Sequence, residues 1–276
     1  MNKHKIIFVG NRPLILREIL LNKKFELIAV DYRGDDLGLD IPVNTRQLNN
    51  CKMLLEYSNH NDFDILISAG CPYLIPLKLM PTNKTYINSH PSALPFGRGL
   101  HPLNECFLSD HKKMGVTLHF MSDNIDCGDI INQIQFNLTN DIDLDLLHSF
   151  IFDLERENFI IGINKLIKSN FSITGIKQDL VLPAYKRNLN DLEGNIKFLK
   201  KNILLRKIKA VGTSNLGFKL NLSDSESIII YSAEEIFNEF LLSRYKKNIQ
   251  GVILRNENFL LIKLVDGIIK VNRWLN

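Results

Sequence analysis

One stretch of the sequence, residues 86–134, gathers the side chains best suited to acid–base chemistry. Asn88 and His90 stand two residues apart at the end of a short apolar run, and a Gly-Arg-Gly loop follows at residues 97–99. An alternating strand comes next, and Asp126 lies in the turn after it. An amide, an imidazole and a carboxylate that converge suit the attack of a neutral amine on an acyl carbon. The amide and a protonated imidazole can stabilise an oxyanion, while the carboxylate orients the imidazole or accepts a proton.

Other common site signatures are missing from the sequence. The turn after the opening strand, residues 9–13, has one of the three glycines of a dinucleotide-binding loop. No G-x-x-x-x-G-K-[ST] phosphate loop and no G-x-S-x-G nucleophile elbow occurs, so neither a nucleoside triphosphate site nor a covalent acyl-enzyme is indicated. The four cysteines lack the spacing of zinc ligands, so no metal site is expected.

The first half of the chain alternates predicted strands and helices. Strands are predicted at 5–9, 25–30, 64–68, 86–88 and 115–121, and helices at 13–21, 103–109 and about 143–168. This alternation predicts an α/β fold, a Rossmann-like, largely parallel sheet with helices on both faces. Ligands bind at the carboxyl ends of the strands in such sheets, which is where Asn88 and His90 fall.

The sequence pattern changes in the last third of the chain. Residues 172–190 lack clear periodicity and are interpreted as a linker, which gives a catalytic domain at 1–180 and a second domain at 186–276. The second domain is predicted to be small and β-rich. Its expected elements are a basic helix at 192–208 and strands at 218–222, 227–231, 251–255, 259–264 and 267–274.

The composition is that of an ordinary globular protein. Of 276 residues, 45% are hydrophobic and 23% charged, which suits a sizeable core and argues against a disordered chain. No apolar run has the length of a membrane span or of a signal-peptide core, so we expect a cytoplasmic protein with reduced thiols. The net charge of +4 is too small to imply nucleic-acid binding, although residues 186–276 carry 16 basic against 9 acidic residues.

In their order along the chain, these motifs resemble the folate-dependent formyltransferase family. The family pattern runs from N-x-H through P-S-L-L-P, R-G and G-x-[TS]-x-H to a D-x-G-[DP]-I turn. The matching segments here are 88–95, 98–99, 115–119 and 126–130. A further likeness covers the opening strand and residues 68–76. Beyond Pro183 the chain more weakly resembles the carboxyl-terminal domain of methionyl-tRNA formyltransferases.

The resemblance implies an N-formyltransferase that uses N10-formyltetrahydrofolate. Asn88 would stabilise the formyl oxygen, His90 would act as general base or proton shuttle, and Asp126 would complete the triad. The pterin would lie between two segments, mostly against backbone groups, with expected contacts at Ser68, Gly70, Cys71, Tyr73, Phe120, Ser122 and Asp123. The amine substrate would lie beside Arg98, Gly99 and His101.

Each of these residues also has a purely structural interpretation. Taken alone, Asn88 or His90 would more often satisfy a turn than catalyse, and the ordered motifs around them reverse this balance. His119 lies on the polar face of its strand, and the sequence favours a role in the site and an ordinary position in the sheet equally. His101 could instead cap the helix that follows it. The basic stretch 197–209 indicates the solvated face of an amphipathic helix, with phosphate or tRNA binding as the alternative.

Three amine substrates compete: methionyl-tRNA, a small purine precursor and a nucleotide-linked amino sugar. The purine-pathway members of the family are typically single domains. Methionyl-tRNA formyltransferases commonly carry R-x-R-G-[AS]-[AS]-P, whereas residues 97–103 read G-R-G-L-H-P-L, a form closer to the sugar N-formyltransferases. We therefore expect a nucleotide-linked 4-amino-4,6-dideoxy sugar for surface glycan biosynthesis, without a nucleic-acid or membrane partner, and leave a homodimer open. The alternatives are a methionyl-tRNA formyltransferase and a non-catalytic folate- or nucleotide-binding module.

Overall fold

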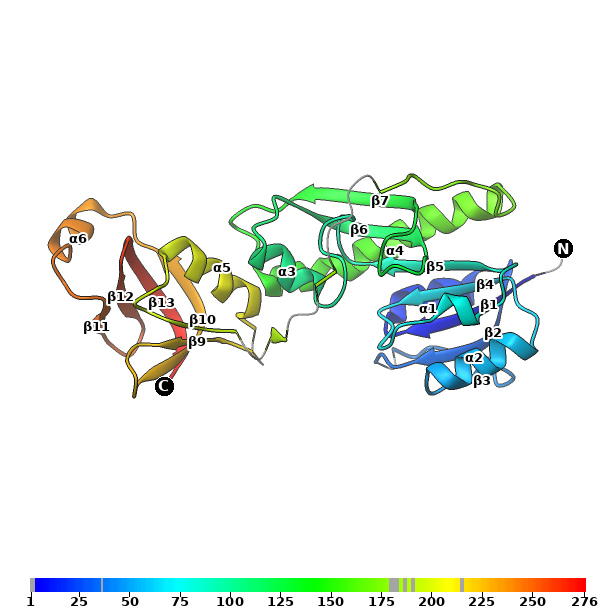
Figure 1. Cartoon of the computed structure of the whole chain (residues 1–276), viewed down its shortest axis with the longest axis horizontal. Helices are drawn as coiled ribbons and strands as arrows, with labels where there is room; N and C mark the ends of the chain where they lie inside the picture. Colours follow the sequence, from blue (N-terminus) through cyan, green and yellow to red (C-terminus); the bar gives the residue numbers. More distant parts are fainter. Residues whose placement is uncertain (1–2, 36, 179–183, 186–187, 190–191, 214–215) are drawn as a thin grey trace. The chain divides into compact units, whose positions relative to one another are not determined.

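The computed structural model describes residues 3–35, 37–178, 184–185, 188–189, 192–213 and 216–276 (Figure 1). By packing, the chain divides into two units. Unit 1 comprises residues 1–102, 113–137 and 149–185, and unit 2 comprises residues 103–112, 138–148 and 186–276. The predicted division at 1–180 and 186–276 stays a prediction, since two short segments of the first half pack within unit 2. Part of the predicted linker lies outside the described residues.

Unit 1 is built on a seven-stranded sheet with the order β3-β2-β1-β4-β5-β6-β7. Its strands are β1 His4–Gly10, β2 Phe25–Tyr32, β3 Arg46–Gln47, β4 Ile65–Ala69, β5 Thr85–His90, β6 Lys113–Phe120 and β7 Ile130–Asn137. The pairs from β3 to β5 are parallel, while β6 is antiparallel to both of its neighbours. The predicted largely parallel α/β sheet is therefore confirmed.

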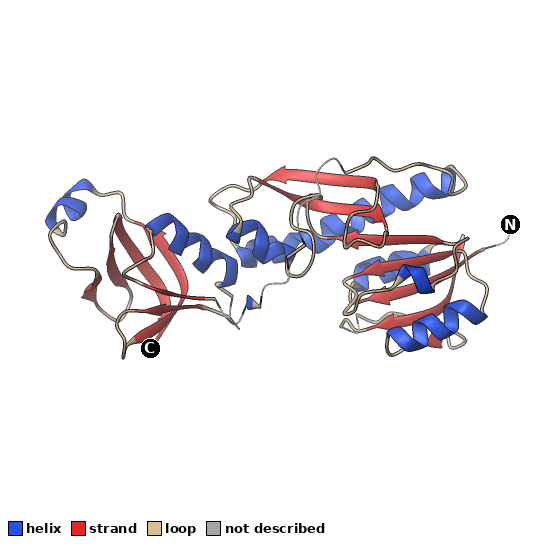
Figure 2. Cartoon of the chain, in the orientation of Figure 1, coloured by secondary structure: helices blue, strands red, loops and turns tan. Residues whose placement is uncertain are grey.

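Helices cover both faces of this sheet (Figure 2). They are α1 Pro13–Leu21, α2 Cys51–His60 and α4 Leu144–Lys168, with a short 3-10 turn, η1, at Leu77–Leu79. Ile6 and Phe8 of β1 belong to the core that includes α1 and α4, whereas Ile7 and Val9 belong to the core that includes α2. Because both faces of β1 are buried, its sequence is a continuous apolar run, which is the signal that predicted the strand.

Unit 2 contains a six-stranded sheet with the order β11-β12-β13-β10-β9-β8. Its strands are β8 Glu193–Asn195, β9 Phe218–Asn221, β10 Ser227–Glu235, β11 Gly251–Arg255, β12 Leu260–Leu264 and β13 Gly267–Leu275. The helices α3 Pro102–Leu108, α5 Lys201–Val211 and α6 Glu239–Arg244 complete the elements outside the first sheet. The predicted small β-rich part of the chain is confirmed.

The predicted helix at 192–208 is wrong at its beginning. Glu193 to Asn195 form β8, which pairs in parallel with β9, and the helix begins at Lys201. The Asn195 side chain accepts a hydrogen bond from the backbone N–H of Lys197 at 2.9 Å, and this local turn ends the strand.

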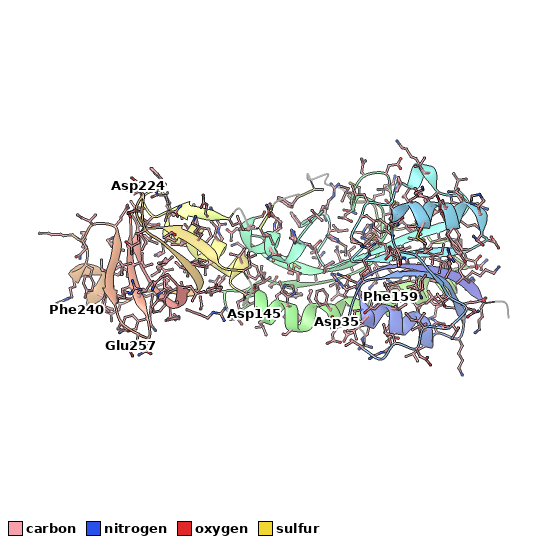
Figure 3. All side chains as sticks on the ribbon, turned by 90° about the horizontal axis from the view of Figure 1, so that it is seen from below. Asp35, Asp145, Phe159, Asp224, Phe240 and Glu257 are labelled. Carbon is pink, nitrogen blue, oxygen red and sulfur yellow. The ribbon has the colours of Figure 1, made fainter. Side chains whose placement is uncertain are left out.

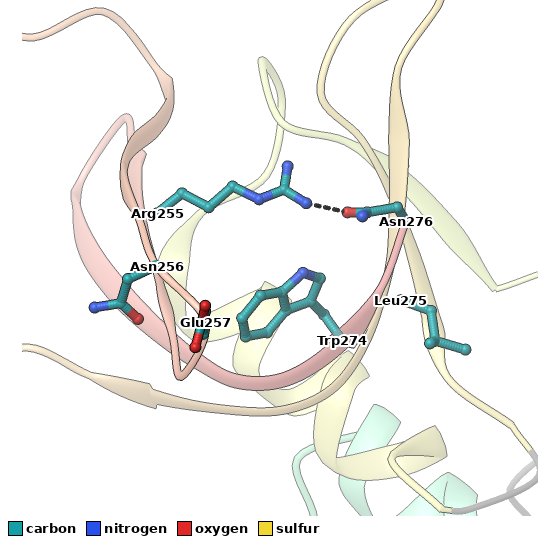
Figure 4. Close-up of a pocket in the computed structure, with 6 residues that line it drawn as sticks. All are labelled: Arg255, Asn256, Glu257, Trp274, Leu275 and Asn276. Carbon is teal, nitrogen blue, oxygen red and sulfur yellow. Dashed lines mark hydrogen bonds between the residues drawn. The ribbon is translucent and has the colours of Figure 1, made fainter.

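Figure 3 shows the side chains of the described residues, and Figure 4 shows a cavity in unit 2. Figure 3 labels Phe159 of α4, which is buried in unit 1, and Phe240 of α6, which is exposed in unit 2. Unit 2 has a cavity of about 460 Å³ beside the ends of β11 and β13, lined by Arg255, Asn256, Glu257, Trp274, Leu275 and Asn276 (Figure 4). None of the predicted site residues lines it. Within the described residues, no helix has both the length and the apolar character to cross a bilayer.

Candidate active site

The predicted catalytic side chains lie at the carboxyl end of β5. Asn88 and His90 point to the same face of the sheet, because alternate residues of a strand share a face. Asn88 pairs directly with His119 across the antiparallel ladder to β6, which puts His119 on that face as well. Asp126 reaches the cluster from the loop after β6, with a φ of 53° in the left-handed region that aspartate tolerates.

The structure brings these four side chains into contact. Asn88 Nδ2 lies 3.1 Å from His119 Nε2 and 3.4 Å from Asp126 Oδ1. Asp126 Oδ2 lies 3.8 Å from His90 Nδ1, and Asp126 Oδ1 lies 3.7 Å from His119 Nε2. The side chain of Asp126 is 12% exposed, and those of His90 and His119 are 8% and 2% exposed. The three predicted catalytic residues therefore meet, and His119 joins them.

His119 is a neutral hydrogen-bond partner inside this cluster. Its Nδ1 lies 2.8 Å from the carbonyl oxygen of Phe120, so this nitrogen carries the ring proton. Burial is the main cause that lowers the pKa of His119 to about 4, which keeps the ring uncharged at neutral pH. Nε2 then accepts from the Asn88 amide, and this contact fixes which way the amide faces.

Asp126 stays ionised although it is nearly buried. Burial is the largest single effect and would raise the pKa of its carboxyl, but the opposing effects of the neighbouring groups, among them His90 and His119, together lower the pKa. The N–H of Gly99, which donates to Oδ2 at 2.9 Å, and the Arg98 guanidinium act in the same direction. The cluster thus holds a carboxylate beside two imidazoles.

His90 has distinct partners for its two ring nitrogens. Nε2 lies 2.9 Å from the carbonyl oxygen of Gly97 and donates to it. Nδ1 is then the nitrogen with the lone pair, and it faces the Asp126 carboxylate. Gly97 has a φ of 68°, a conformation that glycine adopts without strain.

The Gly-Arg-Gly loop positions the aspartate. Arg98 is buried, and its Nε donates to the carbonyl oxygen of Ile125 at 2.9 Å. Gly99 has a φ of 93°, and a Cβ there would overlap the carbonyl oxygen of Tyr185. The exposed His101 makes no hydrogen bond or ion pair with the described cluster. Of the three predicted substrate contacts, Arg98 and Gly99 therefore adjoin the cluster, and a substrate contact at His101 stays a prediction.

Gln178 supports the same loop and was not predicted. Its Nε2 donates to the carbonyl oxygens of Asp126, at 3.0 Å, and Gly128, at 2.7 Å. It lies in the stretch interpreted as a linker, where the sequence has no periodicity or motif that would single out one glutamine.

The first predicted wall of the pterin site follows β4. Ser68 is buried on the strand, and Gly70 has a φ of 67° beside Asn11. Burial raises the pKa of the Cys71 thiol to about 11, so it stays protonated and is a poor nucleophile. The Tyr73 hydroxyl donates to the buried carboxylate of Asp31 at 2.8 Å, which ties its ring to the end of β2.

The second predicted wall follows β6 and adjoins the first. The N–H of Phe120 donates to the carbonyl oxygen of Asp129 at 2.9 Å, and the Ser122 hydroxyl donates to that of Asn124 at 2.9 Å. Asp123 lies 3.7 Å from Lys78 of η1, in the connection that continues from the first wall. The two segments are thus neighbours, and the roles of their residues toward a pterin remain predictions.

The fold is of the α/β class, and the cluster of one amide, two imidazoles and one carboxylate includes no serine or cysteine nucleophile. Residues 41–162 match the family described as formyl transferase. The matched region contains all four side chains of the cluster.

One sequence relative and two solved structures illustrate what this chain is similar to. The chain is 26% identical over 258 residues to a methionyl-tRNA formyltransferase of Finegoldia magna, covering 91% of this chain and 78% of the relative. The N-formyltransferase of Helicobacter canadensis, solved with folinic acid and dTDP-3-aminofucose, is similar in structure with a TM-score of 0.72 at 19% identity, covering 99% of this chain and 100% of that one. HypX of Aquifex aeolicus has a TM-score of 0.66 at 15% identity, covering 99% of this chain, which spans only 44% of HypX.

Proposed function

We propose that this chain transfers a formyl group from N10-formyltetrahydrofolate to the amine of a nucleotide-linked amino sugar, as a step in surface glycan biosynthesis. The observation that carries the proposal is the cluster of Asn88, His90, His119 and Asp126. The cluster supplies amide N–H donors, a proton acceptor and an ionised carboxylate. It holds no serine or cysteine, which suits direct transfer between two amines.

N10-formyltetrahydrofolate would supply the formyl group and the nitrogen that leaves. The arrangement of the chain suits such a cosubstrate, because the segments after β4 and β6 lie side by side. Cys71, Tyr73 and Met121 pack against one core, and Lys78 lies 3.7 Å from Asp123. The Helicobacter canadensis neighbour, which carries folinic acid and aligns with 99% of this chain, supports the choice.

Asn88 stabilises the formyl oxygen in the proposed reaction. One proton of its Nδ2 is donated to His119 Nε2 at 3.1 Å. The other faces Asp126 at 3.4 Å, a long hydrogen bond, and we assign this proton to the oxyanion that develops as the amine attacks. His119 thereby holds the amide in the orientation that the reaction needs.

His90 takes up the proton that the attacking amine loses. Its Nε2–H is engaged with Gly97, so Nδ1 is the acceptor. The imidazolium that forms lies 3.8 Å from the Asp126 carboxylate, which stabilises the charge. From Nδ1 the proton is passed to the nitrogen that leaves.

Two observations bear on the amino sugar. The G-R-G-L-H-P-L form of residues 97–103 favours a 4-amino-4,6-dideoxy sugar, whereas the Helicobacter canadensis neighbour was solved with a 3-amino sugar. Both positions of the amine therefore belong in the assay.

Methionyl-tRNA is the second candidate, favoured by the Finegoldia magna relative. The basic residues of α5 argue against it, because they are engaged within unit 2. Lys201 pairs with Glu235, Arg206 lies 3.1 Å from Asp110, and Lys207 lies 5.5 Å from the centre of the Phe218 ring. A side chain held by its own unit is less available to a phosphate backbone.

The test is an assay of the purified full chain with N10-formyltetrahydrofolate against a panel of amines. The panel holds UDP- and dTDP-linked 3-amino and 4-amino dideoxy sugars and methionyl-tRNA, and mass spectrometry detects the formylated product. We expect transfer to a sugar nucleotide. Transfer to methionyl-tRNA alone would replace the sugar, and no transfer to any amine would favour the non-catalytic binding module.

A further inference from the structure

A buried charge pair lies beneath the strand that carries the catalytic side chains. Glu155 of α4 has a fully buried side chain, and its Oε2 accepts from Arg12 Nε at 2.8 Å. The Arg12 guanidinium also lies 4.2 Å from the centre of the Phe152 ring, on the preceding turn of α4, and donates to Asn11 Oδ1. The second carboxylate oxygen, Oε1, accepts from the Ser89 hydroxyl at 2.9 Å.

Ser89 stands between the two catalytic residues of β5. Successive side chains of a strand point to opposite faces, so Ser89 points to α4 while Asn88 and His90 point into the cluster. Ile87, on the same face as Ser89, packs in one core with Phe159 of α4. The hydrogen bond from Ser89 therefore fixes the backbone from which both catalytic side chains project.

Stability alone does not account for a carboxylate at this position. A buried ion pair contributes little beyond what apolar side chains of similar volume would contribute, because both charges must be desolvated. A carboxylate has another property, in that its two oxygens can join two separate segments. Here Oε2 holds Arg12, at the turn between β1 and α1, and Oε1 holds Ser89 near the end of β5.

We propose that Glu155 is a positioning residue for the transfer reaction. Through Ser89 and Arg12 it locks the carboxyl ends of β5 and β1 against α4, and so sets the places of the Asn88 amide and the His90 ring. This inference rests on the proposed formyl transfer. Geometric precision of this kind affects the rate of the chemical step, since a displacement of about 1 Å can cost about a hundredfold.

The first test removes one hydrogen bond and leaves the ion pair in place. Ser89→Ala should lower kcat about tenfold, with the KM values of both substrates changed less than about twofold. Ser58→Ala is the matched control, because Ser58 is equally buried, on α2, and its hydroxyl donates to the carbonyl oxygen of Leu55. A kcat for Ser89→Ala within twofold of the Ser58→Ala value would overturn the proposal.

The second test guards against a variant that fails to fold. Changing Glu155 alone leaves the largely buried Arg12 guanidinium without its carboxylate partner, so the double variant Arg12→Met, Glu155→Met replaces both charges with apolar side chains. We expect this variant to unfold within a few degrees of the wild-type Tm and to show at least the tenfold loss of kcat. A folded double variant with wild-type kcat would overturn the proposal.

A third measurement separates this inference from the proposed function. The imidazole signals of His90 and His119, followed by NMR, should shift or broaden in Ser89→Ala and stay unchanged in Ser58→Ala. If the wild-type chain formylates none of the amines, the proposed function fails, while these signals still report whether Glu155 and Ser89 position the cluster. Signals identical in both variants would overturn the positioning role.

Discussion

At the level of single residues, the proposed reaction assigns proton transfer to His90. Its Nδ1 faces Asp126, and its Nε2 is held by Gly97. His90→Ala should lower kcat by roughly 10²–10⁴-fold, the usual contribution of a general acid–base residue, while folate affinity by calorimetry stays unchanged. His60→Ala, at the exposed end of α2, is the matched control. A His90→Ala kcat within threefold of this control would remove His90 from the chemistry.

The neutral state of His119 makes stability depend on pH. Its pKa of about 4 in the folded chain lies below the value of about 6.5 for an exposed histidine, so the unfolded chain binds the extra proton between these values. His119 should therefore lower the free energy of unfolding by about 2 kcal/mol from pH 7 to pH 5, and His111, whose pKa burial also lowers, acts in the same direction. The lowered pKa of Asp126 acts only at more acidic pH. Urea titrations at both pH values check this, and an equal fall in His119→Asn would contradict it.

The sequence predicts some residues of the cluster better than others. Asn88, His90 and Asp126 stand in ordered motifs, and alternation puts His119 on the polar side of its strand, which left its role open. The antiparallel register of β5 and β6, which the sequence alone does not give, places His119 opposite Asn88 in the cluster. Gln178 reaches the loop from a segment 52 residues away from Asp126 in sequence, and no local pattern encodes such a contact.

At the scale of elements, the sequence predicts best what is buried on both faces. The strands β1 and β4 hold uninterrupted runs of buried residues, at 6–10 and 65–69, and their positions follow directly. By contrast, β7 lies at the sheet edge and is partly exposed. Its sequence mixes polar and apolar residues, so it lacks a clear strand pattern. Helix α2 has just two buried side chains, Leu54 and Ser58, so its apolar stripe is weak. Both elements were missed for this reason.

Gly99 connects the loop between β5 and α3 to the cluster, because its backbone N–H donates a hydrogen bond to the Asp126 carboxylate. Gly99→Ala should destabilise the chain and lower kcat at least tenfold, since the new Cβ would strike the Tyr185 backbone and displace that N–H. Gly38→Ala is the control. Gly38 also has a positive φ, of 67°, but no atom lies within 4 Å of its Cβ position, so only the left-handed strain of about 1–2 kcal/mol applies. Equal kcat values in the two variants would show that Gly99 does not position Asp126.

At the level of the whole molecule, unit 2 includes segments 103–112 and 138–148 from the first half of the chain as well as residues 186–276. The Asn104 amide of α3 donates to the carbonyl oxygen of Ala210 at 2.7 Å, and Arg206 pairs with Asp110. Sequence patterns are local and do not show which distant segments pack together, so they predict a single boundary at the linker. Asn104→Ala should lower the free energy of unfolding by about 1–3 kcal/mol, because a buried carbonyl loses its donor. Guanidinium titration measures this, and a change below 0.5 kcal/mol, on the order of ordinary surface effects, would count against the contact.

The charge of unit 2 decides between a sugar nucleotide and tRNA as the partner. Each phosphate that a protein neutralises releases counterions, so tRNA binding weakens with salt at a log–log slope of about 0.7–0.9 per contact. Changing Lys200, Lys201 and Lys207 together to Ala should lower kcat/KM on the true substrate less than about threefold, which is below about 1 kcal/mol. The control with the same change of net charge replaces the exposed lysines of unit 1, Lys23, Lys24 and Lys52. Activity of both variants is measured from low to high salt. A loss of about a hundredfold confined to the unit 2 variant, with steep salt dependence in the wild type, would place a nucleic acid on this unit and move methionyl-tRNA ahead of the sugar.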